Sequence, residues 1–330
     1  MPGGNGMLSF LKVHAVKKKL EEVEAYLDQV LHFEHPEIRE FALRTLHAGG
    51  KRVRPSLTIL TASMFKNEDN IVPLAAAMEL LHMASLIHDD VVDEADTRRG
   101  AATINVLKSN RYAIHVGDYI LAEAIDIISK QQNADRLLAI MGVLSAEMSL
   151  GEVEQLRTTY DIHQTIEDYN YRIDRKTALL MATSCQAAAV ASGASDEEIE
   201  RFYKIGYNLG MNFQIEDDIL DMTQDAKKLG KPAGSDLARG IMTLPTILVL
   251  QKDFAEKTEL IRLIEERFPN GQADVERAIN IVIAQNGIQE AEVFAENYLK
   301  DAERDIVALP EYPMKKVLLE GVDFLRGRAF

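Results

Sequence analysis

The chain has 330 residues, 47% of them hydrophobic and 27% charged, which is the composition of an ordinary globular protein with a large core. Its formal net charge of −15 excludes the basic face that nucleic-acid binding needs, so no nucleic-acid partner is expected. The single cysteine, Cys185, excludes an intramolecular disulfide framework and favours a cytoplasmic location, and we expect no transmembrane segment because no run of about 18 uninterrupted apolar residues occurs.

The N-terminal region predicts a short leader followed by amphipathic helices. Residues 1–6 lack the hydrophobic core of a signal peptide, so we expect a disordered leader there. Apolar residues at helical spacing predict one or two helices over 7–33, whose outer face also suits a partner subunit. The proline at position 36 fits the first turn of a further helix over 37–47.

A cluster of basic residues follows, in the segment 49–55 with the sequence Gly-Gly-Lys-Arg-Val-Arg-Pro. The two glycines end one helix, and the proline suits the first turn of the next, over about 55–65. The cluster is either a solvated basic turn or an anion site in which Lys51 and Arg54 join the backbone amides of a helix N-terminus. The acidic motifs described next favour the anion site.

The helix predicted over 71–92 carries Asp89 and Asp90 near its C-terminal end, and Asp93 follows. Asp89 and Asp93 are four residues apart, so their carboxylates lie on one face of the helix. Like charges at the negative end of a helix dipole are destabilising unless a cation lies between them. Oxygen ligands favour Mg²⁺, which takes further ligands from substrate phosphates; a solvated acidic helix end is the alternative.

A second acidic motif, made of Asp217, Asp218 and Asp221, begins 128 residues after the first. It also lies within an apolar helix, and Gln214 precedes Asp217 by three residues on the same face. Two such motifs in buried-looking helices are not typical of a protein surface. Together they predict a two-sided metal site that holds one polyphosphate.

Residues next to the first motif extend this candidate site. His82 lies two turns before Asp89 on nearly the same face, which indicates either a core histidine or contact with a diphosphate. Arg98 and Arg99 precede Gly100 in the loop directly after the motif and predict another anion clamp.

Two or three helices are expected from 103 to 158, with glycines 117, 142 and 151 as close-packing positions. Glu152 and Gln155 there either join the outer shell of a metal or line a pocket wall. Lys176 and Thr177 interrupt the apolar face of a helix over 164–192, where an anionic or electron-rich ligand would explain a buried cation. A capping box at 195–198 predicts the next helix, to about 222.

The C-terminal third predicts a lid and further helices. The polar loop over 224–236, which contains Lys231 among other lysines, is typical of a lid over phosphates. Helices are expected over 241–251, 256–267, 272–286, 288–307 and 312–326. Because alternating apolar runs and linkers are missing, we predict no sheet and a single all-α domain over 7–330.

The order and spacing of these motifs resemble the trans-polyprenyl diphosphate synthase family across about residues 10–330. The resemblance rests on the segment 49–55, His82, the two acidic motifs, Arg98-Arg99-Gly100, Lys176-Thr177, Gln214 and Lys231. It implies a helical bundle around a deep central cavity, usually in a homodimer.

The resemblance also implies roles for individual residues. Asp89, Asp93 and Asp217 would bind three Mg²⁺ ions, with Asp90, Asp218 and Asp221 as supporting carboxylates. One set of side chains would hold isopentenyl diphosphate: Lys51, Arg54, His82 and Arg99. Another would hold the allylic partner, farnesyl or geranylgeranyl diphosphate: Arg98, Lys176 and Lys231. Thr177 and Gln214 would face the developing allylic cation.

Product length is argued from the helix before Asp89. Ala84 and Ser85 lie about one turn down the face along which the product grows, and both are small, so a long product is expected. The chain most closely resembles the large subunit of two-component heptaprenyl diphosphate synthases, which make a quinone side-chain precursor with a small non-catalytic partner. Octaprenyl and geranylgeranyl products are the alternatives.

Some features depart from the family pattern or fit other classes. Many members carry a lysine at the position of Ile241, and the C-terminal Arg326 and Arg328 either cap the isopentenyl site or belong to a solvated tail. A class I terpene cyclase shares the helical fold, but it has no second diphosphate to hold. A catalytically incomplete subunit of a heteromeric synthase is the other alternative.

Overall fold

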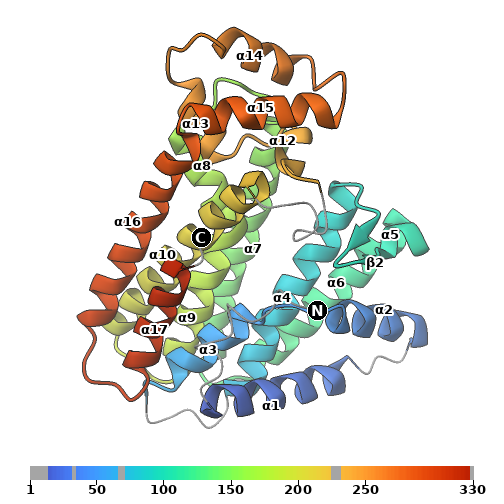
Figure 1. Ribbon diagram of the computed structural model, residues 1–330. Helices are drawn as coiled ribbons and strands as arrows, with labels where there is room; N and C mark the ends of the chain where they lie inside the picture. Colours follow the sequence, from blue (N-terminus) through green and yellow to red (C-terminus); the bar gives the residue numbers. More distant parts are fainter. Residues whose placement is uncertain (1–13, 32–34, 66–70, 224–231, 328–330) are drawn as a thin grey trace.

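The structure is a computed structural model that describes residues 14–31, 35–65, 71–223 and 232–327. Two long helices, α4 (Ile71–Val92) and α10 (Asp196–Thr223), carry the acidic motifs and both pack against α9 (Figure 1). The remaining elements are α1 (His14–Val30), α2 (Pro36–His47), α3 (Val53–Ala62), β1 (Thr97–Arg98), β2 (Ala101–Ala102), α5 (Ile104–Leu107), α6 (Asn110–Ser129), α7 (Ala134–Arg157), α8 (Ile166–Ile173), the π-helix η2 (Asp174–Ala178), α9 (Leu179–Ala191), α12 (Ser235–Ala238), α13 (Leu244–Leu250), α14 (Lys257–Glu265), α15 (Gln272–Ala284), α16 (Gly287–Val307) and α17 (Lys315–Arg326).

The all-α prediction is confirmed, and most of the predicted helices are present. Helix α1 covers 14–30 as one helix, and Pro36 begins α2 as expected. Pro245 lies in the first turn of α13, so the helix predicted from 241 begins only at Leu244, where the missing proline N–H costs no helical hydrogen bond. The predicted capping box is also formed, because the backbone N–H of Ser195 donates to Glu198 at 2.8 Å and that of Glu198 donates to the serine hydroxyl at 3.3 Å.

The prediction of no sheet is wrong in one detail, because β1 and β2 form a minimal antiparallel hairpin. Thr97 pairs with Ala102, and the two residues between the strands have left-handed backbones, with φ of 52° at Arg99 and 78° at Gly100. Two left-handed residues match the turn that joins two-residue hairpins. Strands of two residues are too short to show alternation in the sequence.

The helix predicted as continuous over 164–192 is divided into three segments. Thr165 and Asp168 form a capping box that starts α8. The π-helix η2 follows and α9 continues to Ala191. A π-helical turn holds more residues per turn than an α-helix, so it rotates the side chains after it to a new face, and such turns are frequent at functional sites.

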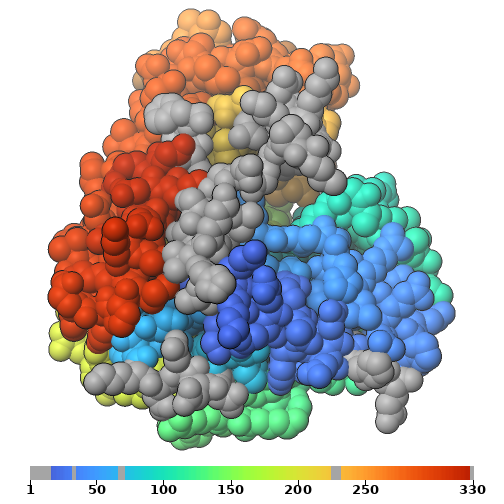
Figure 2. Space-filling view, turned by 60° about the horizontal axis from the view of Figure 1, so that its bottom comes forward, coloured from blue at the N-terminus to red at the C-terminus, as the bar shows by residue number. Residues whose placement is uncertain are grey.

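The core consists of two clusters of buried apolar residues that share helices α10 and α16. Ile199 and Phe202, in its first half, belong to a cluster with α1, α3, α4, α6, α7, α9 and α17. Ile215 and Ile219, in its second half, belong to a cluster with α8 and α13–α16. The second acidic motif lies beside Ile215 and Ile219, so it belongs to the part of α10 that packs against the second cluster. Figure 2 shows α1 and α2 on one side of the lower face and α17 on the other.

Helix α4 is the only described helix long and apolar enough to span a membrane by length and composition. Sixty-seven per cent of its apolar window is buried inside the protein. The helix packs against α1, α3, α6 and α9, so its apolar character is explained by its place in the core.

Two of the three glycines predicted to be close-packing positions are confirmed. A Cβ at Gly117 would lie 2.4 Å from Nε2 of His88, and one at Gly151 would lie 2.7 Å from the Cβ of Arg175. The prediction for Gly142 is wrong, because a Cβ there would meet no atom within 4 Å.

Candidate active site

A cavity of about 420 Å³ lies between α4 and α10 and brings together most of the predicted site residues. Its walls are Gly50, Lys51, Arg52, Val53, Arg54, Glu79, His82, Ser85, Leu86, Asp89, Arg98, Arg99, Lys176, Thr177, Phe213, Gln214 and Asp217. Cations, carboxylates and neutral polar groups therefore share one space, with apolar side chains beside them.

The basic segment before α3 is held in place by Arg52, a residue with a left-handed backbone. Its guanidinium donates to Glu24 of α1, to Glu79 of α4 at 2.9 Å and to the carbonyl of Leu46 at 2.9 Å. These acceptors hold Arg52 in place, and Lys51 and Arg54 of the same segment line the cavity. The sequence did not single out Glu79, although a carboxylate in an apolar helix three residues before His82 was a usable signal.

Arg54 and His82 form a strongly electropositive part of the wall. Burial lowers the pKa of Arg54 to about 10, so the guanidinium remains protonated at neutral pH. Burial and the nearby Arg54 and Arg99 charges hold the pKa of His82 well below its ordinary value, so this imidazole is neutral. A neutral histidine beside two arginines is suited to donate a hydrogen bond to an anion without adding charge.

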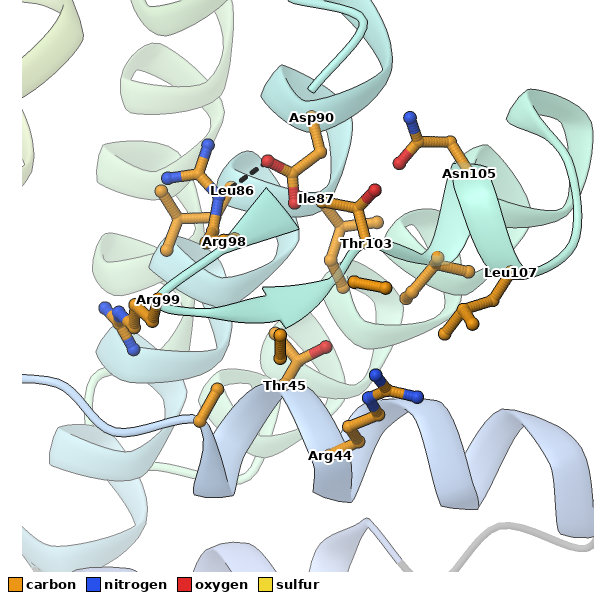
Figure 3. Close-up of a pocket in the computed structure, with 14 residues that line it drawn as sticks. Arg44, Thr45, Leu86, Ile87, Asp90, Arg98, Arg99, Thr103, Asn105 and Leu107 are labelled. Carbon is orange, nitrogen blue, oxygen red and sulfur yellow. Dashed lines mark hydrogen bonds and ion pairs between the residues drawn. The ribbon is translucent and has the colours of Figure 1, made fainter. Parts of the chain in front are cut away.

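Arg98 and Arg99 belong to the hairpin (Figure 3), and both line the main cavity. Arg98 donates from Nε to Asp90 Oδ1 at 2.6 Å, so this aspartate is tied to the hairpin. Arg99 stands at the turn, and its guanidinium approaches Gly50, where a Cβ would lie 2.9 Å from it. A pocket of only about 30 Å³ lies behind the hairpin, with Thr45 in its wall.

The first acidic motif borders a second compartment of about 220 Å³, which shares Asp89, Lys176 and Gln214 with the main cavity. The pKa of Asp89 is raised to about 7, chiefly by burial; the Lys176 ammonium lowers it, and the nearby Glu152 and Asp93 carboxylates raise it. The buried carboxyl thus lacks sufficient compensating charge, as expected of a group that receives a cation.

Arg239 connects the two sides of this second compartment. Its guanidinium donates to Asp93 at 2.9 Å and to Asp236 of α12 at 2.9 Å. Ile241 lines the same compartment, so the position at which the family pattern led us to expect a lysine presents an apolar side chain. The sequence did not predict a role for Arg239, which lies outside every motif.

The π-helix places Lys176 and Thr177 side by side on the cavity wall. The ammonium of Lys176 lies 3.0 Å from Glu152 and donates to Gln155 at 3.1 Å. Gln155 lines the second compartment, which agrees with its interpretation as part of a pocket wall. Lys176 therefore has protein partners on one side and faces the cavity on the other.

A chain of hydrogen bonds connects Thr177 to the second acidic motif. The Thr177 hydroxyl donates to Gln214 Oε1 at 2.6 Å, and Gln214 Nε2 donates to Asp218 Oδ1 at 2.8 Å. Tyr169 of α8 donates its hydroxyl to the other oxygen of Asp218 at 2.8 Å. Burial raises the pKa of Asp218 to about 7, and the two hydrogen bonds oppose that rise.

The remaining acids of the second motif differ in their surroundings. Asp217 lines the main cavity. Asp221 accepts the Ser235 hydroxyl at 2.9 Å and the backbone N–H of Asp236 at 3.2 Å, so it holds the start of α12. Asp89 and Asp217 line the main cavity, and Asp89, Asp93 and Asp218 line the second compartment.

The two residues proposed to control product length are placed differently. Ser85 lines the cavity, and its hydroxyl donates to the carbonyl of His82 at 2.9 Å. Ala84 is 2% exposed and belongs to the first core cluster, away from the cavity wall. A small apolar pocket beside α17 shares Val53 and Phe213 with the main cavity, so the apolar end of the site lies on this side.

Lys231 and Arg328 lie outside the described residues. Arg326 bonds to Glu296 and Glu303 of α16, and it is not among the residues that line the cavity, so the idea that it caps the site is wrong. Its three acidic neighbours, which include Asp323, explain why the side chain stays on α16.

The acids fit a divalent cation only in combination with a ligand. Within the described ranges, no three acidic, histidine or cysteine side chains converge closely enough to hold an ion alone. Mg²⁺ is commonly bound by one or two carboxylates plus phosphate oxygens and water. A set of separate carboxylates on two facing helices suits that mode of binding.

These features are those of an enzyme that binds diphosphates on a helical scaffold, and the comparisons identify its family. Residues 35–282 match the Polyprenyl synthetase family model, so the chain belongs to this family of prenyltransferases and is a trans-polyprenyl diphosphate synthase. Members typically bind a divalent metal.

Three similar proteins show the range of relatives. Heptaprenyl diphosphate synthase component 2 of Bacillus subtilis is 37% identical over 94% of this chain and 88% of its own length. Solanesyl-diphosphate synthase 2 of rice (Oryza sativa, chloroplastic) is 34% identical over 93% and 76%. The crystal structure of Caulobacter crescentus polyprenyl synthase complexed with calcium and isoprenyl diphosphate has a TM-score of 0.88 at 29% identity and covers 98% and 97%.

Proposed function

We propose that this enzyme joins isopentenyl diphosphate to an allylic diphosphate, repeatedly, to make a long all-trans prenyl diphosphate. The observation that supports this most strongly is that a basic set and an acidic set of side chains surround one connected space. Lys51, Arg54, His82 and Arg99 line the main cavity, and Lys176 with Asp89, Asp93, Asp217 and Asp218 lines that cavity or the adjoining compartment. A reaction between two diphosphates needs a binding site for each of them, whereas a terpene cyclase binds only one diphosphate.

The reaction breaks the bond between C1 and oxygen of the allylic substrate, and diphosphate leaves with the electron pair. The double bond of isopentenyl diphosphate then attacks C1, and a proton passes from the condensed product to the released diphosphate. Arg54, Arg99 and Lys176 stabilise negative charge on the diphosphates, and the neutral oxygens of Thr177 and Gln214 face the positive carbon. The apolar side chains of the cavity limit access of water, which would capture the cation.

Divalent cations complete the proposed site, and we propose Mg²⁺ with three ions. Asp89, Asp93 and Asp217 are the residues that would hold them. When bound, the ions would neutralise charge on the departing diphosphate. Asp90, Asp218 and Asp221 would support that arrangement through the hydrogen bonds they accept from Arg98, Gln214 and Ser235.

For product length we propose heptaprenyl diphosphate, the precursor of a quinone side chain. Ser85 leaves the wall below Asp89 open, which favours a long product. The name of the Bacillus subtilis relative supports the heptaprenyl length, and the rice relative supports a longer chain. Octaprenyl and geranylgeranyl products remain the alternatives that the assay below separates.

An exposed apolar surface supports a partner subunit. Helices α5 to α7 carry Val106, Leu107, Ile114, Tyr119, Ile125, Val143, Leu150, Val153 and Leu156, all exposed. Val143 and Val153 are each 62% exposed, which is costly in water. We propose that this surface binds a second copy of the chain or a small non-catalytic subunit, as the word "component" in the relative's name suggests.

The test is a product assay with the purified chain, Mg²⁺, labelled isopentenyl diphosphate and farnesyl or geranylgeranyl diphosphate as allylic partner. We expect labelled prenyl diphosphates whose chain length settles the product, loss of product with a metal chelator, and recovery with added Mg²⁺. If the chain alone gives no product but gives product together with a small subunit, it is the catalytic part of a two-component enzyme. Binding of Mg²⁺ and diphosphate without product in either case would refute a catalytic role and indicate a binding subunit.

A further inference from the structure

A buried tyrosine lies at the far end of the hydrogen-bonded chain that starts at Thr177. Tyr169 is fully buried, and it belongs to α8, which precedes the π-helix that carries Thr177. Its ring packs in the second core cluster, and the guanidinium of Arg172 lies 5.5 Å from the ring centre. The hydroxyl of such a tyrosine needs a partner, and it donates to Asp218 at 2.8 Å.

The two oxygens of Asp218 have different donors, which fixes the amide of Gln214. Oδ2 accepts from Tyr169 and Oδ1 accepts from Nε2 of Gln214. An amide has donors at one end and an acceptor at the other, so the end of Gln214 that faces away from Asp218 is its oxygen. That oxygen accepts the hydroxyl of Thr177 at 2.6 Å.

The orientation of the Thr177 hydroxyl follows from this chain. A hydroxyl has one hydrogen and two lone pairs, and the hydrogen of Thr177 is used on Gln214. The side chain is 7% exposed and lines the cavity, so the lone pairs are what it presents there. If the hydroxyl rotated freely, its positive hydrogen would also point into the cavity and repel a cation.

We propose that Tyr169 is a positioning residue that, through Asp218 and Gln214, keeps the lone pairs of Thr177 directed at the allylic cation. The proposal rests on the proposed function, since it needs a cation in the cavity. In this proposal Asp218 orients the amide of Gln214, in addition to supporting the residues that would hold the metal ions. Tyr169 and Asp218 are 49 residues apart in the sequence, so only the fold brings them together.

The test is a double-mutant cycle between Tyr169→Phe and Thr177→Val, measured as kcat and KM with isopentenyl and farnesyl diphosphates. Each single variant should lower kcat about tenfold, the value expected for loss of one buried hydrogen bond, and leave the KM for isopentenyl diphosphate unchanged. The double variant should be no slower than Thr177→Val alone, because the tyrosine acts only through the threonine. Thr177→Ser keeps the hydroxyl and should retain the sensitivity to Tyr169→Phe.

The control is Tyr207→Phe, which removes a hydroxyl from a half-buried tyrosine on α10. This tyrosine forms no hydrogen bond with Tyr169, Asp218, Gln214 or Thr177. We expect no change in kcat for this variant. If Tyr169→Phe does not fold, a double-mutant cycle between Gln214→Met and Thr177→Val tests whether the same series of hydrogen bonds controls kcat. Additive losses in kcat, or a loss confined to KM, would overturn the proposal, whereas absence of prenyl transfer by the wild-type chain, even with a partner subunit, would instead contradict the proposed function.

Discussion

The affinity of the site for Mg²⁺ should depend on pH because of the carboxyl of Asp89. Burial raises its pKa to about 7, so near neutral pH a large share of the metal-free protein holds a proton there. A cation that binds this carboxylate must displace that proton. Below the pKa the proton competes with the metal and above the pKa it does not, so the affinity rises with pH.

The magnitude follows from one coupled proton. A carboxyl with a pKa of about 7 makes the apparent dissociation constant for Mg²⁺ about tenfold larger at pH 6 than at pH 8. At pH 7 about half a proton should be released for each ion bound at Asp89. An unperturbed aspartate, with its pKa near 4, would give almost no change over this range.

Isothermal titration calorimetry with Mg²⁺, on protein that already holds inorganic diphosphate and in buffers of different ionisation enthalpy, measures both quantities. Asp89→Asn should weaken binding and remove the pH dependence. Asp301→Asn, which changes an exposed carboxylate on α16 that pairs with Arg304, should leave both unchanged. Equal affinities at pH 6 and pH 8 in the wild-type chain, with no proton release, would refute the assignment of Asp89 as a metal ligand.

Three substitution experiments test other parts of the site and its scaffold. Asp217→Ala should abolish prenyl transfer while circular dichroism and the melting temperature stay near wild type; retained activity would contradict its role. Ser85→Phe should shorten the product, read by chromatography, because this residue lines the cavity, whereas Ala84→Phe should chiefly destabilise the core by about 1–3 kcal/mol. An unchanged product from Ser85→Phe would refute the argument about the cavity wall. Gly117→Ala should lower stability in urea denaturation because its Cβ would meet a histidine ring, while Gly142→Ala should raise it by about 0.5–1 kcal/mol; equal effects would show that the packing argument is wrong.

Much of the site could be predicted from the sequence because local periodicity decides it. The spacing of the acids on α4 and α10 determines which of them share a helix face, and the structure places Asp89 and Asp217 on the same cavity. Helix caps such as Ser195 with Glu198 are short-range signals and were also readable. The general fold followed from helical patterns and the absence of strand alternation.

The contacts that could not be predicted connect distant parts of the chain. Arg239 and Asp93 are 146 residues apart, and nothing in the local sequence of either indicates the other. The π-helix depends on one residue more than an α-helical turn, which the apolar pattern does not reveal. Ala84 and Ser85 point about 100° apart around the helix, and the sequence did not indicate which of the two faces the cavity.

The ion pairs of Arg239 determine what a metal ion must displace when it binds with the substrate. Its guanidinium lies between Asp93 and Asp236 and serves both carboxylates as a counter-ion. We therefore expect metal binding at Asp93 to be an exchange of partners, in which the ion takes the place of the guanidinium on this carboxylate. The released guanidinium would remain beside the incoming diphosphate, where the neutral Ile241 supplies no charge.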